Sequence, residues 1–201
     1  MPMGELHQLR LVTVTQLLKS AGATSVLDLG CGSGALLQYL VREPQFMRIL
    51  GLEQSGAGLV QAKQRLSEYL ATEGGCLELV CASYTEGQAR FSGFDAAAMV
   101  ETIEHVPSER LSEVESSIFG VYRPRVVVMT TPNREYNPLF DLAPGEYRDP
   151  DHCFEWDRAK FRQWASGIAK RKGYRVTFSG IGDMHPYLGQ PTQLAEFVRL
   201  T

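Results

Sequence analysis

The stretch DLGCGSG, residues 28–34, decides the fold of this chain. It follows a short apolar run at 25–29 and precedes a segment, 34–41, that has the apolar spacing of a helix. Glycine lets the backbone turn sharply and approach a ligand closely, so three glycines between a strand and a helix predict a nucleotide-type binding loop. Such a loop is weak evidence by itself, because several doubly wound families use one.

Apolar and polar segments alternate on both sides of this loop. Helices are expected at 6–20, 34–41, 56–70, 107–121 and 157–172, and strands at 25–29, 49–53, 76–82, 94–100, 125–131, 175–180 and 194–200. This alternation predicts an α/β fold built on a mostly parallel seven-stranded sheet. The polar stretch 132–153 is longer than most loops in compact domains, so we expect it to act as a lid or binding loop.

Length and composition limit the functions that this chain can have. With 201 residues and 44% hydrophobic content, we expect one domain over residues 1–201, and the start Met-Pro-Met-Gly leaves open that it is the C-terminal part of a longer protein. A net charge of −3 argues against a protein that coats nucleic acid broadly, although a partner bound at its tip stays possible. Four cysteines without a C-x-x-C pair predict a reducing, cytoplasmic setting, and no apolar run is long enough to predict a membrane span.

The stretch ETIEHV places two carboxylates and an imidazole at the expected end of the strand 94–100. In a helix, Glu101, Glu104 and His105 would share one face. Two carboxylates that close repel each other unless a positive charge lies between them, so we expect a divalent cation, with His152 as a candidate fourth ligand. The alternative is an ordinary helix start, in which Glu101 caps the helix and the other two side chains are solvated.

The form of the glycine-rich loop resembles the class I S-adenosylmethionine-dependent methyltransferases, which have a Rossmann-like fold. Glu53 ends the second strand, where an acidic side chain can accept both ribose hydroxyls of an adenosine. The resemblance implies that Asp28 lies near the methionine part of the cofactor and that Ser83 borders the adenine. The cofactor-binding residues are then Asp28, Gly30, Gly32, Gly34, Glu53 and Ser83. The alternatives are that Asp28 only fixes the loop and that Glu53 is a solvated strand end.

Three stretches together resemble one family more closely: ETIEH at 101–105, TTPNREYNPLF at 130–140 and RDPDHCFEW at 148–156. They are similar to the catalytic domain of the Hua-enhancer-type RNA 3′-terminal 2′-O-methyltransferases, from about residue 20 to the end of the chain. The resemblance implies that a magnesium or manganese ion binds the 2′- and 3′-hydroxyls of the terminal ribose. The metal-binding and catalytic residues would be Glu101, Glu104, His105 and His152, with His105 also a possible general base. Cys153 departs from the basic or polar residue expected there.

The same resemblance implies the RNA 3′ end as partner. A bacterial member would work beside a kinase-phosphatase-ligase in RNA repair. Basic residues between 158 and 175 suit phosphates, although an ordinary solvated helix face explains them as well. Phe154 and Trp156 could stack on a base, but we expect core packing for Trp156. Asn133 and Tyr136 are expected at the rim of the site, where either could touch substrate.

Two other functions compete with this one. A quinone-type small-molecule O-methyltransferase also carries a stretch like E-x-x-E-H-V, but it would be expected to bring an amphipathic, membrane-touching segment, whereas 132–153 is polar. A non-catalytic domain could bind cofactor or RNA only to stabilise a larger assembly. The intact loop and the four candidate ligands favour an enzyme.

Overall fold

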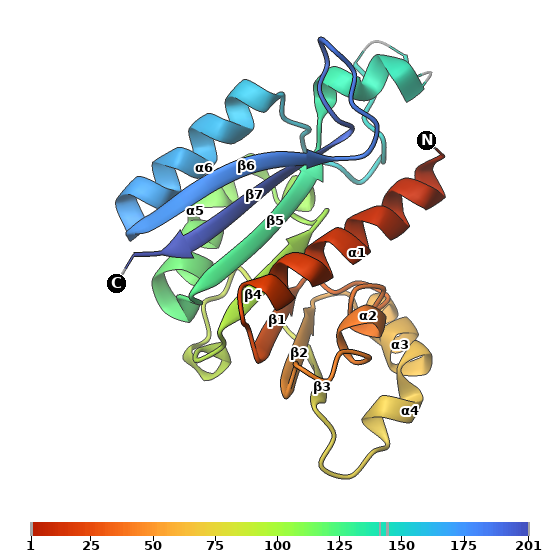
Figure 1. Ribbon diagram of the computed structural model, residues 1–201, viewed down its shortest axis with the longest axis vertical. Coiled ribbons are helices and arrows are strands. Elements are labelled where there is room, and N and C mark those ends of the chain that lie inside the picture. The colour runs from red at the N-terminus through yellow and green to blue at the C-terminus, as the bar shows by residue number, and fades with distance from the viewer. Residues whose placement is uncertain (1, 141, 144, 201) are drawn as a thin grey trace.

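The computed structural model describes residues 2–140, 142–143 and 145–200, which form a seven-stranded sheet with helices on both faces (Figure 1). The strands are β1 Ser25–Leu29, β2 Arg48–Glu53, β3 Leu77–Cys81, β4 Ala96–Val100, β5 Val126–Pro132, β6 Tyr174–Ile181 and β7 Thr192–Arg199. Their order in the sheet is β3-β2-β1-β4-β5-β7-β6. β1 to β5 are parallel, and β7 runs antiparallel to both β5 and β6. The predicted α/β class and mostly parallel sheet are therefore confirmed.

The helices are shorter and more broken than the sequence predicts. They are α1 Met3–Ser20, α2 Leu37–Leu40, α3 Gly56–Arg65, α4 Ser67–Leu70, α5 Leu111–Val114 and α6 Arg158–Lys172, with shorter or irregular turns η1 Ala89–Phe91, η2 Ile103–His105, η3 Ser108–Arg110, η4 Glu115–Tyr122 and η5 Arg134–Phe140. The predicted helix 34–41 keeps only its last turn, because Gly34 has φ +80 and cannot continue a right-handed helix. The predicted helix 56–70 breaks at the fully buried Leu66. The segment predicted as one helix at 107–121 is instead η3, α5 and the π-helical η4 in succession.

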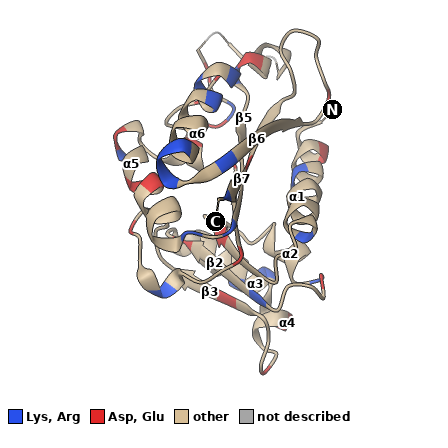
Figure 2. Cartoon of the chain, turned by 60° about the vertical axis from the view of Figure 1, so that its left-hand side comes forward, with Lys and Arg blue, Asp and Glu red and all other residues tan. Residues whose placement is uncertain are grey.

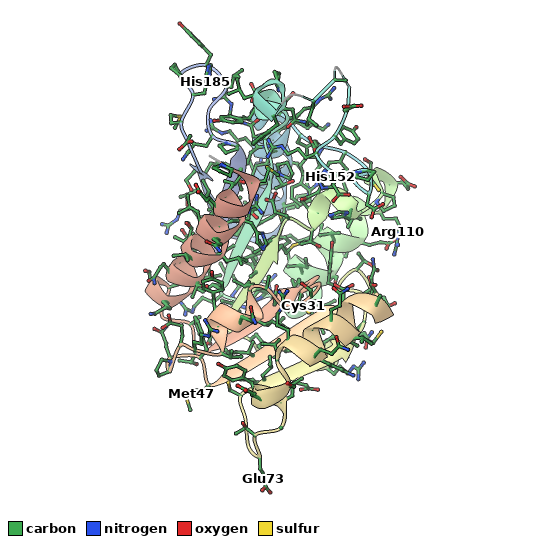
Figure 3. The ribbon with its side chains drawn as sticks, turned by 90° about the vertical axis from the view of Figure 1, so that its right-hand side faces the viewer. Cys31, Met47, Glu73, Arg110, His152 and His185 are labelled. Carbon is green, nitrogen blue, oxygen red and sulfur yellow. The ribbon has the colours of Figure 1, made fainter. Side chains whose placement is uncertain are left out.

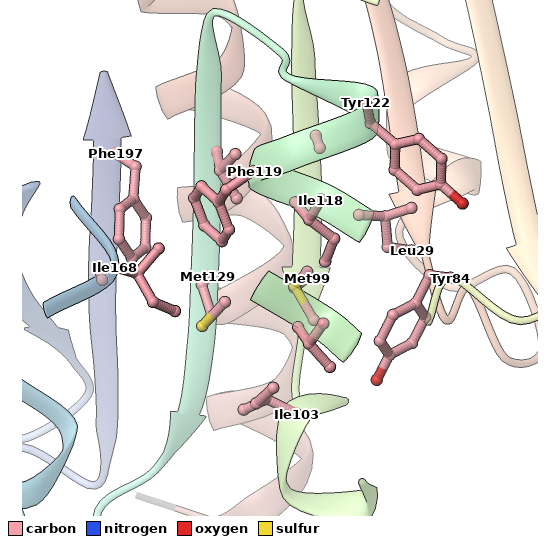
Figure 4. Close-up of a cluster of buried hydrophobic side chains, with 14 of the residues drawn as sticks. Leu29, Tyr84, Met99, Ile103, Ile118, Phe119, Tyr122, Met129, Ile168 and Phe197 are labelled. Atoms are coloured by element: carbon pink, nitrogen blue, oxygen red, sulfur yellow. The ribbon is translucent and has the colours of Figure 1, made fainter. Parts of the chain in front are cut away.

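Two apolar layers hold the sheet between them. On one face, α1 and α2 bury Leu6, Val14, Leu18 and Leu37 against the sheet. On the other face, η4 and α6 bury Ile118, Phe119, Phe161 and Ile168, and Figure 4 shows Phe119 beside Phe197 of β7. Because both faces are covered, β5 is buried along its whole length. Within the described ranges, no helix has the length and apolar content that a bilayer span requires.

The topology brings several loops to one edge of the sheet. Val100 at the end of β4 pairs with Thr130 of β5, so the segment after β4 lies beside the end of β5. Pro132 at the end of β5 pairs with Thr192 at the start of β7, which adds the β6–β7 loop to the same edge. The described residues of the predicted binding stretch 132–153 also lie there, and Arg148 holds them by donating to the carbonyls of Asn133 at 2.6 Å and Pro191 at 2.8 Å. This edge is therefore where a site would be assembled.

Candidate active site

The glycine-rich loop after β1 depends on backbone conformations that favour glycine. Gly30, Gly32 and Gly34 all have positive φ, at +78, +53 and +80. A Cβ atom added at Gly30 would lie 2.5 Å from Oγ1 of Thr102, so this position excludes any side chain. The Gly30 N–H donates to the carbonyl of Leu52 at 2.9 Å, which joins the loop to β2. The prediction of a tight binding loop between β1 and the following helix is confirmed in its geometry.

Asp28 and Glu53 lie on either side of this loop and are both buried. Asp28 is 2% exposed, and its Oδ2 has no hydrogen-bond partner among the described residues. Burial, and then the nearby charge of Glu53, raise the pKa of Asp28 to about 7. Glu53 accepts hydrogen bonds from the N–H groups of Gly32 at 2.8 Å and Ser55 at 2.6 Å. Glu53 therefore fixes the loop, while Asp28 keeps one oxygen free for a cationic or hydrogen-donating ligand.

Two cavities meet at this edge of the sheet. One, of about 390 Å³, is lined by residues that include Gly30, Glu53, Ser83 and His105. Within it, Ser83 Oγ lies 2.8 Å from Oγ1 of Thr85, so the hydroxyl of Ser83 already has a partner. The second cavity, of about 250 Å³, is lined by residues that include Arg10, Asp28, Gly30 and Glu101. Gly30 and Glu101 border both cavities, so one ligand can extend from the loop toward β4.

A cluster of possible metal ligands reaches the larger cavity through His105, which is one of the residues that line it. Glu104, His105 and His152 each offer one ligand atom, and these atoms lie within 4.8 Å of one another. The backbone brings them together, because the N–H of Cys153 donates to the carbonyl of Glu104 at 2.8 Å. The imidazoles of His105 and His152 stand edge to face, with ring centroids 4.8 Å apart. Segments distant in the sequence therefore form one group of donors, as predicted for these three residues.

Hydrogen bonds orient the two imidazoles. Nδ1 of His152 lies 2.6 Å from Oε1 of the buried Glu155. Nδ1 of His105 lies 3.2 Å from the carbonyl oxygen of Asp151. A carboxylate and a carbonyl accept hydrogen bonds, so both contacts fit the tautomer in which Nδ1 carries the proton and Nε2 offers a lone pair to a ligand. The Nε2 of His152 lies 4.0 Å from Oε1 of Glu104, which directs it toward the cluster.

Glu104 provides the carboxyl group at the centre of the cluster. It is fully buried, and its Oε2 accepts from Oγ1 of Thr131 at 3.0 Å. Its Oε1 is buried without a hydrogen-bond partner among the described residues. Burial, and then the charge of Glu101, raise the pKa of Glu104 well above its ordinary value. An unpaired buried carboxylate oxygen beside two free imidazole nitrogens fits a divalent cation such as Mn²⁺ or Mg²⁺, with Mn²⁺ favoured by mixed nitrogen and oxygen ligands.

Glu101 lies differently from its prediction. Its φ is +51, in the left-handed region, and the helical turn starts only at Ile103. The prediction that helical spacing puts Glu101, Glu104 and His105 on one face is therefore wrong. The carboxylate of Glu101 makes an ion pair with Arg10 of α1 at 3.2 Å and is absent from the group of three described above. Its charge still acts on Glu104, so the two carboxylates remain neighbours.

The other residues singled out from the sequence divide between core and surface. Trp156 is 7% exposed and stacks on Phe154 with centroids 4.3 Å apart, so core packing is confirmed for Trp156 and also holds for Phe154. Asn133 is fully buried and its amide donates to the carbonyls of Leu188 and Gln190, both at 2.8 Å, so it supports the β6–β7 loop. Cys153 is exposed at the cluster, where its Sγ lies 3.4 Å from the carbonyl of His105.

The basic residues of α6 are visible along that helix in Figure 2, and part of their charge is already paired. Arg158 contacts Glu135 at 2.7 Å and Arg171 contacts Glu115 at 2.8 Å. Exposed pairs of this kind contribute little to stability and can exchange partners with phosphates. The alternatives of a phosphate-binding surface and a solvated helix face both fit these contacts.

Sequence reasoning missed the residues that support the cluster. Glu155 orients His152, and Asn137 in turn donates to Glu155. Arg148 also donates to this group, through its backbone N–H to Glu155 at 2.8 Å and through Nε to Asn137 at 2.7 Å. A signal was present for Glu155, which stands three residues after His152 within DHCFEW. The contributions of Asn137 and Arg148 come from tertiary contacts that spacing alone does not reveal.

Comparison with known proteins agrees with this geometry. A family model described as a methyltransferase domain matches residues 27–128. The small RNA 2′-O-methyltransferase of Mus musculus is 34% identical over 203 residues, which cover 96% of this chain and 51% of that protein. The crystal structure of the methyltransferase domain of bacterial CtHen1-C is 40% identical with a TM-score of 0.88, and the match covers 98% of this chain and 100% of that chain. The structure of small RNA methyltransferase HEN1 is 32% identical with a TM-score of 0.89, covering 96% of this chain and 26% of the other. This chain thus spans about half the length of the mouse relative.

Proposed function

The chain belongs to the Hen1 family of methyltransferase domains, and from this premise we propose that it methylates the 2′-hydroxyl of the 3′-terminal nucleotide of RNA. The methyl donor is S-adenosylmethionine, and a divalent cation is required. The observation that carries the proposal is the shared cavity, in which His105 of the ligand cluster lines the same space as Gly30 and Glu53 of the cofactor loop. A methyl donor and a cation-held hydroxyl could therefore be bound next to each other.

The bound groups would supply the reactive methyl group and the positive charge, and the protein would bind and orient them. S-adenosylmethionine supplies an activated methyl group on its sulfonium, and a divalent cation supplies positive charge that lowers the pKa of a ribose hydroxyl. Glu104, His105 and His152 would hold that cation, with Glu101 joining them once it leaves Arg10. Glu53 and Ser83 would bind the adenosine, and Asp28 the methionine part. Because Nδ1 of His105 faces a carbonyl, its single free nitrogen can act as a ligand or as a proton acceptor, but not as both at once.

Selectivity for the RNA end follows from the number of hydroxyls that one cation can bind. Only a 3′-terminal ribose offers free 2′- and 3′-hydroxyls on adjacent carbons, so internal riboses and terminal phosphates lack the pair. The test uses labelled S-adenosylmethionine, Mn²⁺ and RNA strands ending in a 2′,3′-diol, a 2′-deoxy, a 3′-deoxy or a 3′-phosphate sugar. We expect transfer to the diol alone. Label on all four RNAs, or label without metal, would contradict the proposal.

The same assay separates the competing functions. A catechol added in place of RNA tests the quinone-type alternative, which transfer to the catechol alone would favour. Binding of labelled cofactor without transfer to RNA or catechol would favour a non-catalytic domain. The polar character of 132–153 and its fastening by Arg148 support the RNA reading.

A role in bacterial RNA repair, beside a kinase-phosphatase-ligase, extends this proposal. It rests on the family resemblance and on the 40% identity to a bacterial domain. The Pnkp1/Rnl/Hen1 RNA repair complex contains a chain 20% identical to this one, a likeness that carries the fold only. Co-purification of the protein with an RNA ligase from its own source would support the role, and methylation of the 3′ ends of cleaved RNA before ligation would test it directly.

A further inference from the structure

The ion pair between Arg10 and Glu101 joins the two halves of the site. Arg10 lies on α1 and is only 6% exposed, and its Nη2 lies 3.2 Å from Oε2 of Glu101 and 3.1 Å from Oγ1 of Thr192. Nε of Arg10 and Oε1 of Glu101 are both buried without a hydrogen-bond partner among the described residues. The pair is therefore incompletely satisfied on both sides, which is costly for buried charged groups.

The surroundings of Arg10 identify the chemistry of its second partner. Arg10 lines the same cavity as Asp28, whose Oδ2 is also unpaired. This cavity is thus lined by an unpaired carboxyl oxygen, from Asp28, and by an unpaired guanidinium nitrogen, from Arg10. An α-amino acid group has the matching ammonium and carboxylate, and S-adenosylmethionine ends in such a group. His7, one helical turn before Arg10, has its pKa lowered by burial and then by Arg10, so Arg10 is the cation of this cavity.

We propose that Arg10 couples cation binding to cofactor binding by exchanging one carboxylate for another. Without ligands, Arg10 neutralises Glu101. A divalent cation at Glu104, His105 and His152 would neutralise Glu101 in its place, which leaves the buried guanidinium free for the carboxylate of the cofactor. Each ligand therefore removes the competitor of the other, and the coupling must be equal in both directions. This inference rests on the proposed function, because it assumes the cation and the cofactor named there.

The test measures binding without RNA and without methyl transfer. Free Mn²⁺ is followed by electron paramagnetic resonance during titration of the protein, alone, with saturating S-adenosylhomocysteine, or with methylthioadenosine, which lacks the amino acid group. We expect S-adenosylhomocysteine to tighten Mn²⁺ binding about tenfold, within the usual range of such couplings. Methylthioadenosine should have no such effect. Calorimetry of S-adenosylhomocysteine with and without Mn²⁺ should return the same factor.

Variants assign the coupling to Arg10. Arg10→Gln should bind Mn²⁺ more tightly than the wild type in the absence of cofactor, and S-adenosylhomocysteine should no longer change that affinity. Arg10→Lys, which keeps the charge, should retain part of the coupling. Lys19→Gln is the matched control, because Lys19 makes another ion pair of α1, with Glu43 at 2.5 Å, and lies near the end of the helix away from the site. Thermal unfolding checks that each variant is folded.

The outcomes separate this inference from the proposed function. If the wild type binds no Mn²⁺, both fail. If it binds Mn²⁺ equally well with and without S-adenosylhomocysteine, the cation site stands and the coupling is overturned, even should Arg10→Gln not fold. The inference is also overturned if S-adenosylhomocysteine tightens Mn²⁺ binding to Arg10→Gln as much as to the wild type. Arg10 would then not be the residue that exchanges one carboxylate for the other.

Discussion

The proposed cofactor end and the proposed cation end of the site each keep one buried carboxyl group with an unpaired oxygen, but they are built in different ways. Asp28 belongs to a continuous strand and loop, where three glycines with positive φ set the shape. Glu104 belongs to a cluster assembled from two segments of the chain. A hydrogen bond from the N–H of Cys153 to the backbone carbonyl of Glu104 joins these segments. Local backbone geometry makes the first end, and tertiary contacts make the second.

This difference predicts how each end responds to substitution. The loop should keep its shape when a side chain other than that of Glu53 changes, since its conformation is held by glycines, by β2 and by the carboxylate of Glu53. The cluster should lose its geometry when any supporting contact is removed, because His152 is held by Glu155 and Glu155 by Asn137 and Arg148. The cation end should therefore be the more fragile, and the following substitutions test this from the largest expected effect to the smallest.

Removal of a cation ligand should have the largest effect. His152→Ala takes away one of three grouped donors, so we expect methyl transfer to fall by about 10³-fold or more. Affinity for S-adenosylhomocysteine in the absence of metal should stay within about twofold of the wild type, because the cofactor loop does not depend on His152. Transfer is measured with diol-ended RNA, and cofactor affinity by calorimetry.

His185→Asn provides the control for this variant. His185 lies in the β6–β7 loop, apart from His152 in Figure 3, and its Nδ1 accepts from the N–H groups of Tyr187 and Leu188. An asparagine can accept similar bonds, so activity should change little. Loss of metal-free cofactor binding in His152→Ala to the same degree as activity would show that the shape of the cofactor loop depends on His152.

The unpaired carboxylate of Asp28 should make the stability of the ligand-free protein depend on pH. Its pKa is raised from 3.8 to about 7, so the folded state binds a proton that the unfolded state has released. The free energy of unfolding should therefore fall as pH rises from about 4 to about 7, by about 4 kcal/mol from this group, given about 1.4 kcal/mol per pKa unit. Glu104 acts in the same direction, because its pKa is also raised.

Asp28→Asn should remove the contribution of Asp28, so the free energy of unfolding should depend less steeply on pH. Urea denaturation at pH 4.5 and pH 7.5 measures the change. Glu73→Gln is a suitable control, since Glu73 is exposed at the tip of the molecule in Figure 3. An equally steep decline in wild type and Asp28→Asn would mean that Asp28 is ionised in the folded protein and has found a partner.

The sequence alone predicted the backbone of the glycine-rich loop and the strands around it well. The positive φ at Gly30 and Gly34 and the positions of Asp28 and Glu53 follow from one contiguous motif and from strands with clear apolar patterns. All seven predicted strands are present, with bounds that differ by at most two residues. Such features depend on interactions local in the chain, which residue spacing records directly.

The cation end was predicted only in part. The grouping of Glu104, His105 and His152 was anticipated, but the spacing argument assumed a regular helix from Glu101 onward. The left-handed φ of Glu101 breaks that assumption, and nothing in the residue type warns of it, because glutamate rarely adopts this conformation. The partner that holds Glu101 lies on α1, far away in the sequence. Periodicity carries no information on such contacts.

Glu155 gives the next prediction, because it orients a ligand without being one. Glu155→Gln can still occupy the site but cannot hold Nδ1–H of His152 with a charged acceptor. We expect Mn²⁺ affinity to fall by about 10- to 100-fold, the usual effect of losing such an outer partner. Glu135→Gln is the control, since Glu135 is paired with Arg158 away from the cluster. Unchanged Mn²⁺ affinity in Glu155→Gln would show that the ring of His152 is held by its backbone alone.

Ser83 should show the smallest effect, and the comparison with Asp28 explains why. Both residues border the cofactor cavities, but Ser83 Oγ already has partners in the side chain and the N–H of Thr85, whereas Oδ2 of Asp28 has none among the described residues. A ligand gains most from a buried group whose hydrogen bonding is incomplete. Ser83→Ala should therefore weaken S-adenosylhomocysteine binding by no more than about tenfold, one ordinary hydrogen bond. Calorimetry of Ser83→Ala and Asp28→Asn at pH 7.5 compares the two directly. A larger loss in Ser83→Ala would mean that cofactor contacts, and not unpaired atoms in the ligand-free protein, decide affinity at this end.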